Sequence, residues 1–509
     1  VDASNRKRNY YSGKDLIQFS KTAGGIATIE TLKEMYWQNE NYFNYNKEFN
    51  KNNRMNVMLG ASWQQRVAES VEATSQNFSD DFYQWHNLGA GTVTIPSKSE
   101  DYGWSINSYF ARINYTLKDR YLFTATGRYD GSSKFGKNNK YAFFPSFAFA
   151  WRASEESFLK GVNWLNNLKV RTSIGETGNQ EIGNYAFYQK LGSENTIFGN
   201  DYYTALYRST FGNPDLKWEK TLQWDAGVDV SVLNQRIDLS LDYYYKKTTD
   251  LLNTVSLPSS SGYSSTVRNI GSMSNRGVEL LVEADVVQKK DFGFTLQFNI
   301  AHNKNRVEEL ADGDDILGTT YSNYGSGSIT IIREGEPLGA FYVYKDAGLD
   351  EKGSLSYVDM NGDGQYTDTE DRYIAGSPFP DFTYGLNCGF RYKNWDFNFF
   401  LQGSQGNDVF NLSEMRNYSY GQGMNIERKV YYESWREGQD NSHVHYPKVE
   451  AVGSLKYSDR FIENGSYLRL KTLEVGYTLP KSIVNKIRFN KIRVFFIGTN
   501  LLTFAKFKE

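Results

Sequence analysis

Cysteine, histidine, basic clusters and long hydrophobic runs are all scarce in this sequence. The 509 residues include one cysteine, Cys388, so an internal disulfide framework is excluded, and with only four histidines a zinc-type centre is not expected. No apolar run reaches the roughly 18 residues that a transmembrane helix needs, which excludes the class of helical membrane proteins. The formal net charge is −2 and no basic block occurs, so nucleic acid is not an expected partner.

What the sequence has instead is a strict alternation of apolar and polar residues. In residues 221–245, apolar side chains occupy every second position on both sides of a polar turn at 233–236. Because side chains alternate across a strand, this pattern predicts an antiparallel hairpin with one apolar and one mostly polar face. Each run is about as long as the roughly 9–11 tilted residues that cross a bilayer as a strand. The expected lipid-facing residues are Val228, Val230, Ile237 and Leu239, and the expected lumen-facing residues are Asp225, Asp229 and Asp242.

The alternating unit repeats along the chain. We count about 14 such segments, nearly all in hairpins, and in the last pair, at 467–477 and 492–502, a phase slip near Thr472 predicts a bulge. Most connections at one end of the hairpins are short polar turns, whereas most at the other end are long and rich in aromatic residues. This asymmetry is typical of outer-membrane barrels. The sequence therefore predicts an all-β protein, a transmembrane antiparallel β-barrel, with a soluble β-protein of half-buried strands as the alternative.

Four polar stretches are expected to be long connections. They cover roughly 65–102, 178–216, 303–380 and the residues before 464, and each is far longer than a usual hairpin loop. Their aromatic side chains suit either stacking on sugar rings or packing against other loops or a partner, so individual substrate-contacting residues stay unknown. These aromatic residues include Phe82, Tyr83, Trp85, Tyr202, Tyr203, Tyr207, Tyr321, Tyr324, Tyr418 and Tyr420.

Seven short segments narrow the class further. In chain order they are RYDGSSKFG at 128–136, GNQ at 178–180, NPDLKWE at 213–219, NRGVE at 275–279, GEPLG at 335–339, SYLRLK at 466–471 and TNLL at 499–502. Together they resemble the SusC/RagA-type TonB-dependent transporters of the bacterial outer membrane, and they are spread over almost the whole chain.

The resemblance implies a particular domain organisation. Members of the family have a 22-stranded barrel, an N-terminal plug inside it and a TonB-contacting segment ahead of the plug. With about 14 strands, residues 1–509 are then expected to be a partial receptor barrel from which the plug, the TonB-contacting segment, the early strands and the closing strand are missing. An open sheet would leave two unpaired edges in lipid, which is why we expect a longer parent chain.

The most specific chemical motif is DMNGDGQYTDTE at residues 359–370. It has oxygen-bearing groups at positions 1, 3, 5, 7, 9 and 12 and glycine at position 6, which is the spacing of a calcium-binding loop. The expected calcium ligands are the side chains of Asp359, Asn361 and Asp363, the carbonyl of Gln365, a weak or water-mediated contact of Thr367, and the bidentate carboxylate of Glu370. The alternative is a turn-rich surface loop that binds nothing.

The function that the resemblance implies is the TonB-energised import of a nutrient. Oligosaccharides are the expected substrate and peptides are the alternative, with a SusD-like surface lipoprotein as partner on the side of the long loops. No catalytic set emerges: the histidines lie in separate segments, and no G-x-S-x-G or H-E-x-x-H motif is present, so an enzyme is not expected. A surface β-protein that binds glycans without transporting them is the remaining alternative.

Overall fold

The computed structural model describes residues 1–199, 201–263, 265–310, 313–318, 327–418, 425–448 and 455–507. One antiparallel sheet of 15 strands dominates these residues. Its strands, in spatial order, are β1 (Asp2–Ser12), β2 (Ile26–Asn50), β3 (Asn53–Phe78), β4 (Gly91–Leu117), β5 (Tyr121–Ser132), β6 (Tyr141–Arg152), β7 (Leu165–Asn179), β10 (Glu219–Val232), β11 (Ile237–Thr249), β14 (Ser272–Gln288), β15 (Phe292–Glu309), β22 (Phe382–Tyr392), β23 (Trp395–Gln405), β26 (Tyr467–Thr478) and β27 (Arg493–Ala505). We call this sheet the wall.

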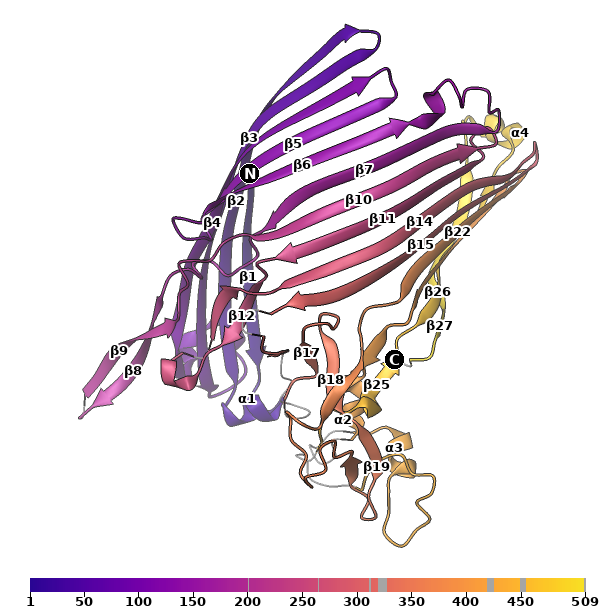
Figure 1. The fold of residues 1–509 in the computed structure, drawn as a ribbon. Coiled ribbons are helices and arrows are strands. Elements are labelled where there is room, and N and C mark those ends of the chain that lie inside the picture. The colour runs from indigo at the N-terminus through magenta and orange to yellow at the C-terminus, as the bar shows by residue number, and fades with distance from the viewer. Residues whose placement is uncertain are drawn as a thin grey trace.

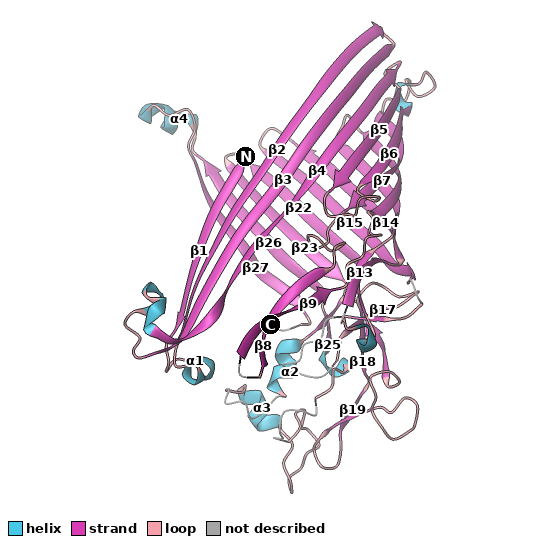
Figure 2. Ribbon diagram, turned by 90° about the vertical axis from the view of Figure 1, so that its left-hand side faces the viewer, coloured by secondary structure: helices cyan, strands magenta, loops and turns pink. Residues whose placement is uncertain are grey.

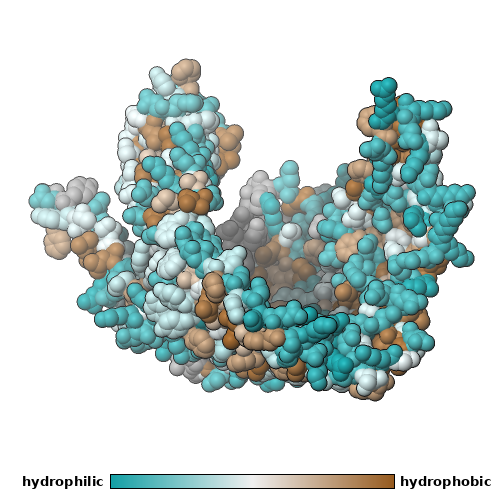
Figure 3. Space-filling view, turned by 90° about the horizontal axis from the view of Figure 1, so that it is seen from above, coloured by the Kyte–Doolittle hydropathy of each residue, from teal (hydrophilic) through white to brown (hydrophobic). Residues whose placement is uncertain are grey.

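The wall is strongly curved. Figures 1 and 2 show that the tilted strands bend around a hollow, with β1 and β27 as the two lateral strands of the sheet. The space-filling view from above shows this hollow as an open trough between two raised sides (Figure 3). Among the described residues no ladder joins β1 to β27.

The expected strands are present, and two segments correct the sequence-based picture. Each of the 14 predicted segments lies in a wall strand, and β1 is the additional one. The prediction of a connection over 65–102 is wrong for most of its length, because β3 continues to Phe78 and β4 begins at Gly91, paired from Asn53 with Leu117 to Phe78 with Gly91. At about 3.3 Å per residue, strands of this length extend far beyond the roughly 30 Å of hydrocarbon, so their outer parts need no apolar face.

The two ends of the wall differ in their connections, as predicted. At one end the turns are short: residues 51–52 join β2 to β3, residues 118–120 join β4 to β5, and residues 393–394 join β22 to β23. Lys118 and Asp119 both adopt left-handed backbone conformations, with φ of 55° and 56°, as a tight hairpin turn requires. The predicted bulge is also confirmed, since the register between β26 and β27 shifts between Leu470 and Thr472.

The long connections at the other end carry small elements of their own. No helix of the described residues is long and apolar enough to cross a membrane. The short strands are β8 (Lys190–Phe198), β9 (Asp201–Thr210), β12 (Leu252–Ser256), β13 (Ser265–Asn269), β16 (Ile316–Leu317), β17 (Thr330–Ile332), β18 (Ala340–Tyr344), β19 (Asp346–Leu349), β20 (Leu355–Tyr357), β21 (Arg372–Gly376), β24 (Asp408–Phe410) and β25 (Ile462–Asn464). The helices of the described residues are α1 (Gln18–Thr22), α2 (Leu412–Asn417), α3 (Arg428–Glu433) and α4 (Lys481–Val484), with 3-10 turns η1 (Gln84–His86), η2 (Leu88–Ala90), η3 (Ala153–Glu155), η4 (Ser259–Ser261), η5 (Asp459–Phe461) and η6 (Asn485–Ile487).

The connections β15–β22 and β23–β26 fold together into a compact body, which we call the loop unit and define as the described residues of 310–381 and 406–466. Figure 1 shows it below the wall, around β17 to β19, β25, α2 and α3. The two segments are joined by a backbone hydrogen bond of 2.9 Å from Tyr344 N–H to Tyr457 C=O. Its apolar core consists of Ile329, Phe341, Val343, Met415, Tyr418, Val430, Tyr446, Leu455, Tyr457 and Phe461.

Candidate functional site: the polar wall and the loop unit

The pairing register confirms the two faces predicted for residues 221–245. Val228 lies opposite Leu241 and Val230 opposite Leu239, so these side chains share one face of the wall. Asp229 lies opposite Ser240 on the other face. The apolar face carries large side chains that are open to the surroundings, since Leu241 is 44% exposed. The polar face lines the hollow side of the wall.

Two carboxylates of the polar face, those of Asp229 and Asp242, are held by an arginine that the sequence analysis did not single out. Arg171, on β7, donates to Asp242 at 2.7 Å and to Asp229 at 3.1 Å, and it also donates to the Ser240 hydroxyl at 3.0 Å. The three acceptors lie on β10 and β11, so this network ties three strands together across the polar face. Charge-assisted hydrogen bonds of this kind fix side-chain positions on a surface that faces water. Because side chains alternate along β7, Arg171 lies on the face opposite to that of the apolar Val170. This alternation is the sequence signal that could have placed Arg171 on the polar face.

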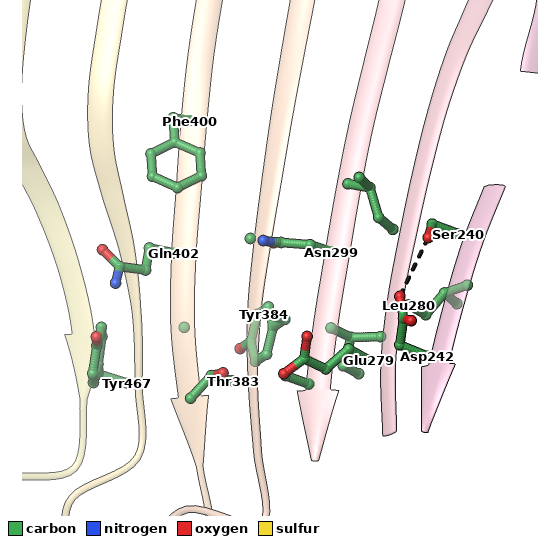
Figure 4. A pocket seen from close by; sticks show the side chains of 15 residues that line it. Ser240, Asp242, Glu279, Leu280, Asn299, Thr383, Tyr384, Phe400, Gln402 and Tyr467 are labelled. Carbon is green, nitrogen blue, oxygen red and sulfur yellow. Dashed lines mark hydrogen bonds between the residues drawn. The ribbon is translucent and has the colours of Figure 1, made fainter. Parts of the chain in front are cut away.

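Next to this network lies a hollow of about 510 Å³ on the polar face. Figure 4 shows it, with side chains converging from β11, β14, β15, β22, β23 and β26. One row of the ladder crosses it: Ser240 lies opposite Leu281, which lies opposite Asn299. Asn299 lies opposite Gly385, which in turn lies opposite Gln402. Its side chains carry mostly carboxylate, amide and hydroxyl groups, and three of them are aromatic, namely Phe400, Tyr384 and Tyr467. The arrangement offers many hydrogen-bonding groups and little net charge beyond its carboxylates.

Two of the segments that carry the family resemblance pack against each other at the loop end of the wall. Phe135 belongs to the segment RYDGSSKFG and Trp218 to the segment NPDLKWE, and their ring centroids are 5.2 Å apart. Leu216 is fully buried beside them. The indole N–H of Trp218 donates to the carbonyl of Lys140 at 2.9 Å. These residues therefore form a small packed core at the loop end of the wall, and their role is structural.

The loop unit buries part of the aromatic set that was considered for sugar stacking. Tyr418 is only 4% exposed and contacts Phe461 edge-on, with 5.1 Å between ring centroids, so it packs loops together. Phe82, by contrast, is 83% exposed, and Tyr203 and Tyr207 are about half exposed. Tyr321, Tyr324 and Tyr420 lie outside the described residues, as does the side chain of Tyr202.

The predicted calcium loop is described in full and lies exposed on the loop unit. Backbone N–H groups donate to its side chains: Gly362 and Gly364 each donate to Asp359 at 2.7 Å, and Gln365 donates to Asp363 at 2.7 Å. The amide of Asn361 donates to Glu370 at 3.1 Å, which brings positions 3 and 12 together. The loop thus folds into the compact turn that the spacing requires. Within the described residues no group of three or more His, Cys, Asp or Glu side chains converges tightly enough to hold a metal, so calcium stays a prediction.

A residue just beyond the motif anchors this loop, and the sequence analysis missed it. Asp371 is fully buried, and its carboxylate accepts the N–H of Thr367 at 2.7 Å and that of Met360 at 2.8 Å. The hydrogen bond from Thr367 is the main reason that the pKa of Asp371 is lowered from its usual value. Asp371 therefore closes the loop from inside as an anion. Nothing in the motif pattern identifies it, since carboxylates abound in this stretch.

The folding pattern and the polar wall define the class of protein: a β-barrel protein of the outer membrane. Comparison with known proteins gives the family. The family described as "TonB dependent receptor-like, beta-barrel" matches residues 2–501. TonB-dependent receptor P3 of Formosa agariphila is 36% identical over 501 residues, which cover 95% of this chain and 49% of that protein. TonB-dependent receptor SusC of Bacteroides thetaiotaomicron is 38% identical over 388 residues, which cover 73% of this chain and 37% of SusC.

Solved structures agree. The RagAB peptide transporter superposes with a TM-score of 0.83 at 26% identity, covering 99% of this chain and 56% of the matched chain. The chain belongs to the TonB-dependent receptor family of outer-membrane β-barrels and is of the SusC/RagA type. It spans about half the length of TonB-dependent receptor P3 and of TonB-dependent receptor P26 of Formosa agariphila, to which it is 34% identical over 526 residues.

Proposed function

We propose that this chain is the barrel portion of an importer that carries oligosaccharides across the outer membrane, driven by TonB. The observation that carries the proposal is the combination of a wall whose hollow face is lined by polar groups with a loop unit packed at one end. A polar lumen suits the passage of a hydrated solute, and long packed loops suit its capture at the cell surface. Family membership supports the energy source.

The proposal includes two partner proteins, TonB and a SusD-like surface lipoprotein. TonB would act through a plug and a TonB-contacting segment, which would lie in the part of the relatives' length that this chain does not span. The lipoprotein would cover the loop unit. The similarity to SusC at 38% identity and to a structure titled as the RagAB transporter supports both partners.

The experiment is uptake by cells. Deleting the parent gene should abolish the accumulation of fluorescent neutral oligosaccharides, and restoring the gene should recover it. A protonophore should stop uptake without stopping surface binding, because TonB-dependent import needs an energised inner membrane. Surface binding without any energy-dependent uptake would contradict import and favour a glycan-binding surface protein that does not transport.

Peptide import is the second candidate, and one observation favours it. The structure with a TM-score of 0.83 is titled a peptide transporter. Fluorescent oligopeptides in the same uptake assay separate the two substrates. Peptide uptake that depends on the gene, with no oligosaccharide uptake, would replace the first candidate by the second.

We also propose that the loop at 359–370 binds calcium. Its oxygen-bearing residues are of the type that calcium prefers. A carboxylate oxygen that accepts one backbone N–H keeps a lone pair for a cation, and only one oxygen of Asp363 accepts such a hydrogen bond. When bound, calcium would supply charge neutralisation among Asp359, Asp363 and Glu370. Calorimetry on the purified full-length protein should show a chelator-sensitive site that Asp363→Ala removes and that Asp350→Ala, in a neighbouring turn of the loop unit, leaves in place. A wild-type protein that binds no calcium would reject the site.

A further inference from the structure

The hollow on the polar face contains side chains without protein partners. Glu279, Asn299 and Gln402 make no side-chain hydrogen bond or ion pair with any residue in the described part of the chain, although neighbouring polar residues do. Asp242, which lies opposite Glu279 in the ladder, is by contrast engaged by Arg171. Polar side chains of a wall are usually linked to one another, as the Arg171 network is. A gap of free donors and acceptors in such a wall is what a ligand site presents.

The centre of the hollow is shaped by a glycine and a phenylalanine. Gly385 lies between Asn299 and Gln402 in the ladder, so no side chain separates the two amides. A Cβ atom at position 385 would lie 2.5 Å from the side-chain oxygen of Asn299 and 3.2 Å from the ring of Phe400. Strands are about 4.8 Å apart, so the two amides stand on backbones about 10 Å from each other. The Phe400 ring lies on the strand of Gln402, two residues before it, and approaches position 385. The hollow therefore has an apolar floor and amide groups on both sides.

The chemistry of these groups selects among ligands. An aromatic ring packs on the C–H face of a sugar, while amides and carboxylates pair with hydroxyl groups as donors and acceptors. The uncompensated carboxylate of Glu279 disfavours anionic ligands. An extended peptide is commonly held through main-chain hydrogen bonds at a free sheet edge, but β14, β15, β22 and β23 are paired on both sides here. The lining thus favours a neutral polyhydroxylated ligand.

We propose that Asn299, Gln402, Phe400 and Glu279 form a binding site for a neutral oligosaccharide on the inner wall of the barrel. Asn299 and Gln402 hold the hydroxyl groups of one sugar unit from two sides, Phe400 supports its apolar face, and Glu279 accepts from a neighbouring hydroxyl. Gly385 leaves room for the Asn299 amide, which a Cβ atom at this position would displace. This inference rests on the proposed import function, because it places a substrate contact within the lumen of the importer.

The test is binding by the purified full-length transporter in detergent. The probes are neutral linear hexasaccharides of α-glucan, β-glucan, mannan, xylan and fructan, a hexameric oligogalacturonate as an anionic probe, and a pool of hexapeptides, each measured by calorimetry. At least one neutral hexasaccharide should bind. Asn299→Ala and Gln402→Ala should each weaken that binding roughly 5- to 10-fold, as the loss of one or two hydrogen bonds predicts. Phe400→Leu, which keeps the floor apolar but removes the ring, should weaken it as well.

Asn398→Ala is the matched control. Asn398 lies on the same face of the same strand, four residues from Gln402 and thus about 13 Å away, outside the hollow. The affinity of the Asn398→Ala variant for the hexasaccharide should be within 2-fold of that of the wild type. Heat-modifiable gel migration verifies the fold of every variant. The proposal is overturned if no neutral probe binds, if only the oligogalacturonate or the peptides bind, or if the Asn299 and Gln402 variants behave like Asn398→Ala.

The uptake assay separates this inference from the function on which it rests. Wild-type oligosaccharide uptake together with unchanged uptake by the Asn299 and Gln402 variants would overturn the wall site and leave the import function standing. Absence of oligosaccharide uptake by the wild type would instead overturn the proposed function itself.

Discussion

The wall and the loop unit of this protein are stabilised by different means. On the wall, large apolar side chains such as Trp224 and Leu241 are 43% and 44% exposed, and the strands are held by their ladder. In the loop unit, Tyr457 and Phe461 are fully buried in a core of their own. The wall takes its apolar surroundings from the bilayer, whereas the loop unit provides its own, as a soluble domain does. Because the two regions are stabilised in different surroundings, a substitution that destabilises one region should leave the other folded.

The largest effect is expected from emptying the core of the loop unit. Phe461→Ala removes a ring that contacts Tyr418 and Phe410, and truncating a buried phenylalanine typically costs about 3–5 kcal/mol. Limited proteolysis should cut the loop unit of this variant rapidly, while heat-modifiable migration of the barrel stays normal. Tyr432→Ala, at an exposed position of α3, is the control and should resist proteolysis like the wild type. Loss of barrel assembly in Phe461→Ala would mean that the two regions are not independent.

The converse change is a charge on the apolar face of the wall. Leu241 lies between Val228 and Leu280 of the adjacent strands, and an arginine on the lipid face of a barrel costs about 2–4 kcal/mol near the bilayer midplane. Leu241→Arg should therefore lower the amount of heat-modifiable protein in the outer membrane. Ser231→Arg, on the polar face beside Asp238, should assemble nearly as well as the wild type. Equal defects in both variants would contradict the assignment of the faces.

A smaller effect is expected on the polar face. Arg171→Met leaves Asp229 and Asp242 without their shared partner, and because all three side chains are partly exposed we expect a loss of about 1–2 kcal/mol. The urea midpoint of barrel unfolding in detergent measures it. The Arg54–Asp119 pair is about half exposed on both sides, so Arg54→Met should shift the midpoint far less. If the two variants are equally stable, the Arg171 network does not tie the wall strands together.

Much of the wall was predictable because its pattern repeats and has a physical cause. Lipid on one face and water on the other force alternation at Val228, Asp229 and Val230, and the same cause acts on every strand within the bilayer. It stops acting outside the bilayer, which is why the sequence pattern does not indicate strands in the outer parts of β3 and β4. There the ladder holds the strands together with scattered contacts such as the ion pair between Arg66 and Glu34, and neither produces an alternating side-chain pattern.

The site was less predictable than the fold. The carboxylates of the polar face were found from their phase in the strands, but the hollow depends on Gly385 lying between Asn299 and Gln402, and that follows only from the pairing of β15, β22 and β23. The register between strands that are far apart in sequence depends on the whole sheet, so no single segment of the sequence determines it. The core of the loop unit likewise joins two connections that are separated by a complete hairpin of the wall.

The smallest expected effect concerns acid and the anchor of the predicted calcium loop. Because the pKa of Asp371 is lowered in the folded protein, its contribution to stability is fully present above its pKa in the unfolded chain, about 3.9, and is lost as the pH falls through the lower folded value. Hydrogen exchange of the loop at 359–371, measured in chelator, should thus be constant from pH 7 to 5, after correction for the intrinsic exchange rate. Protection should fall below about pH 4. Asp371→Asn places an amide where two N–H donors point, so its loop should be less protected at pH 6 and should change little on acidification. If the variant loses protection over the same acidic range as the wild type, another carboxylate is responsible and the loop is not closed by Asp371.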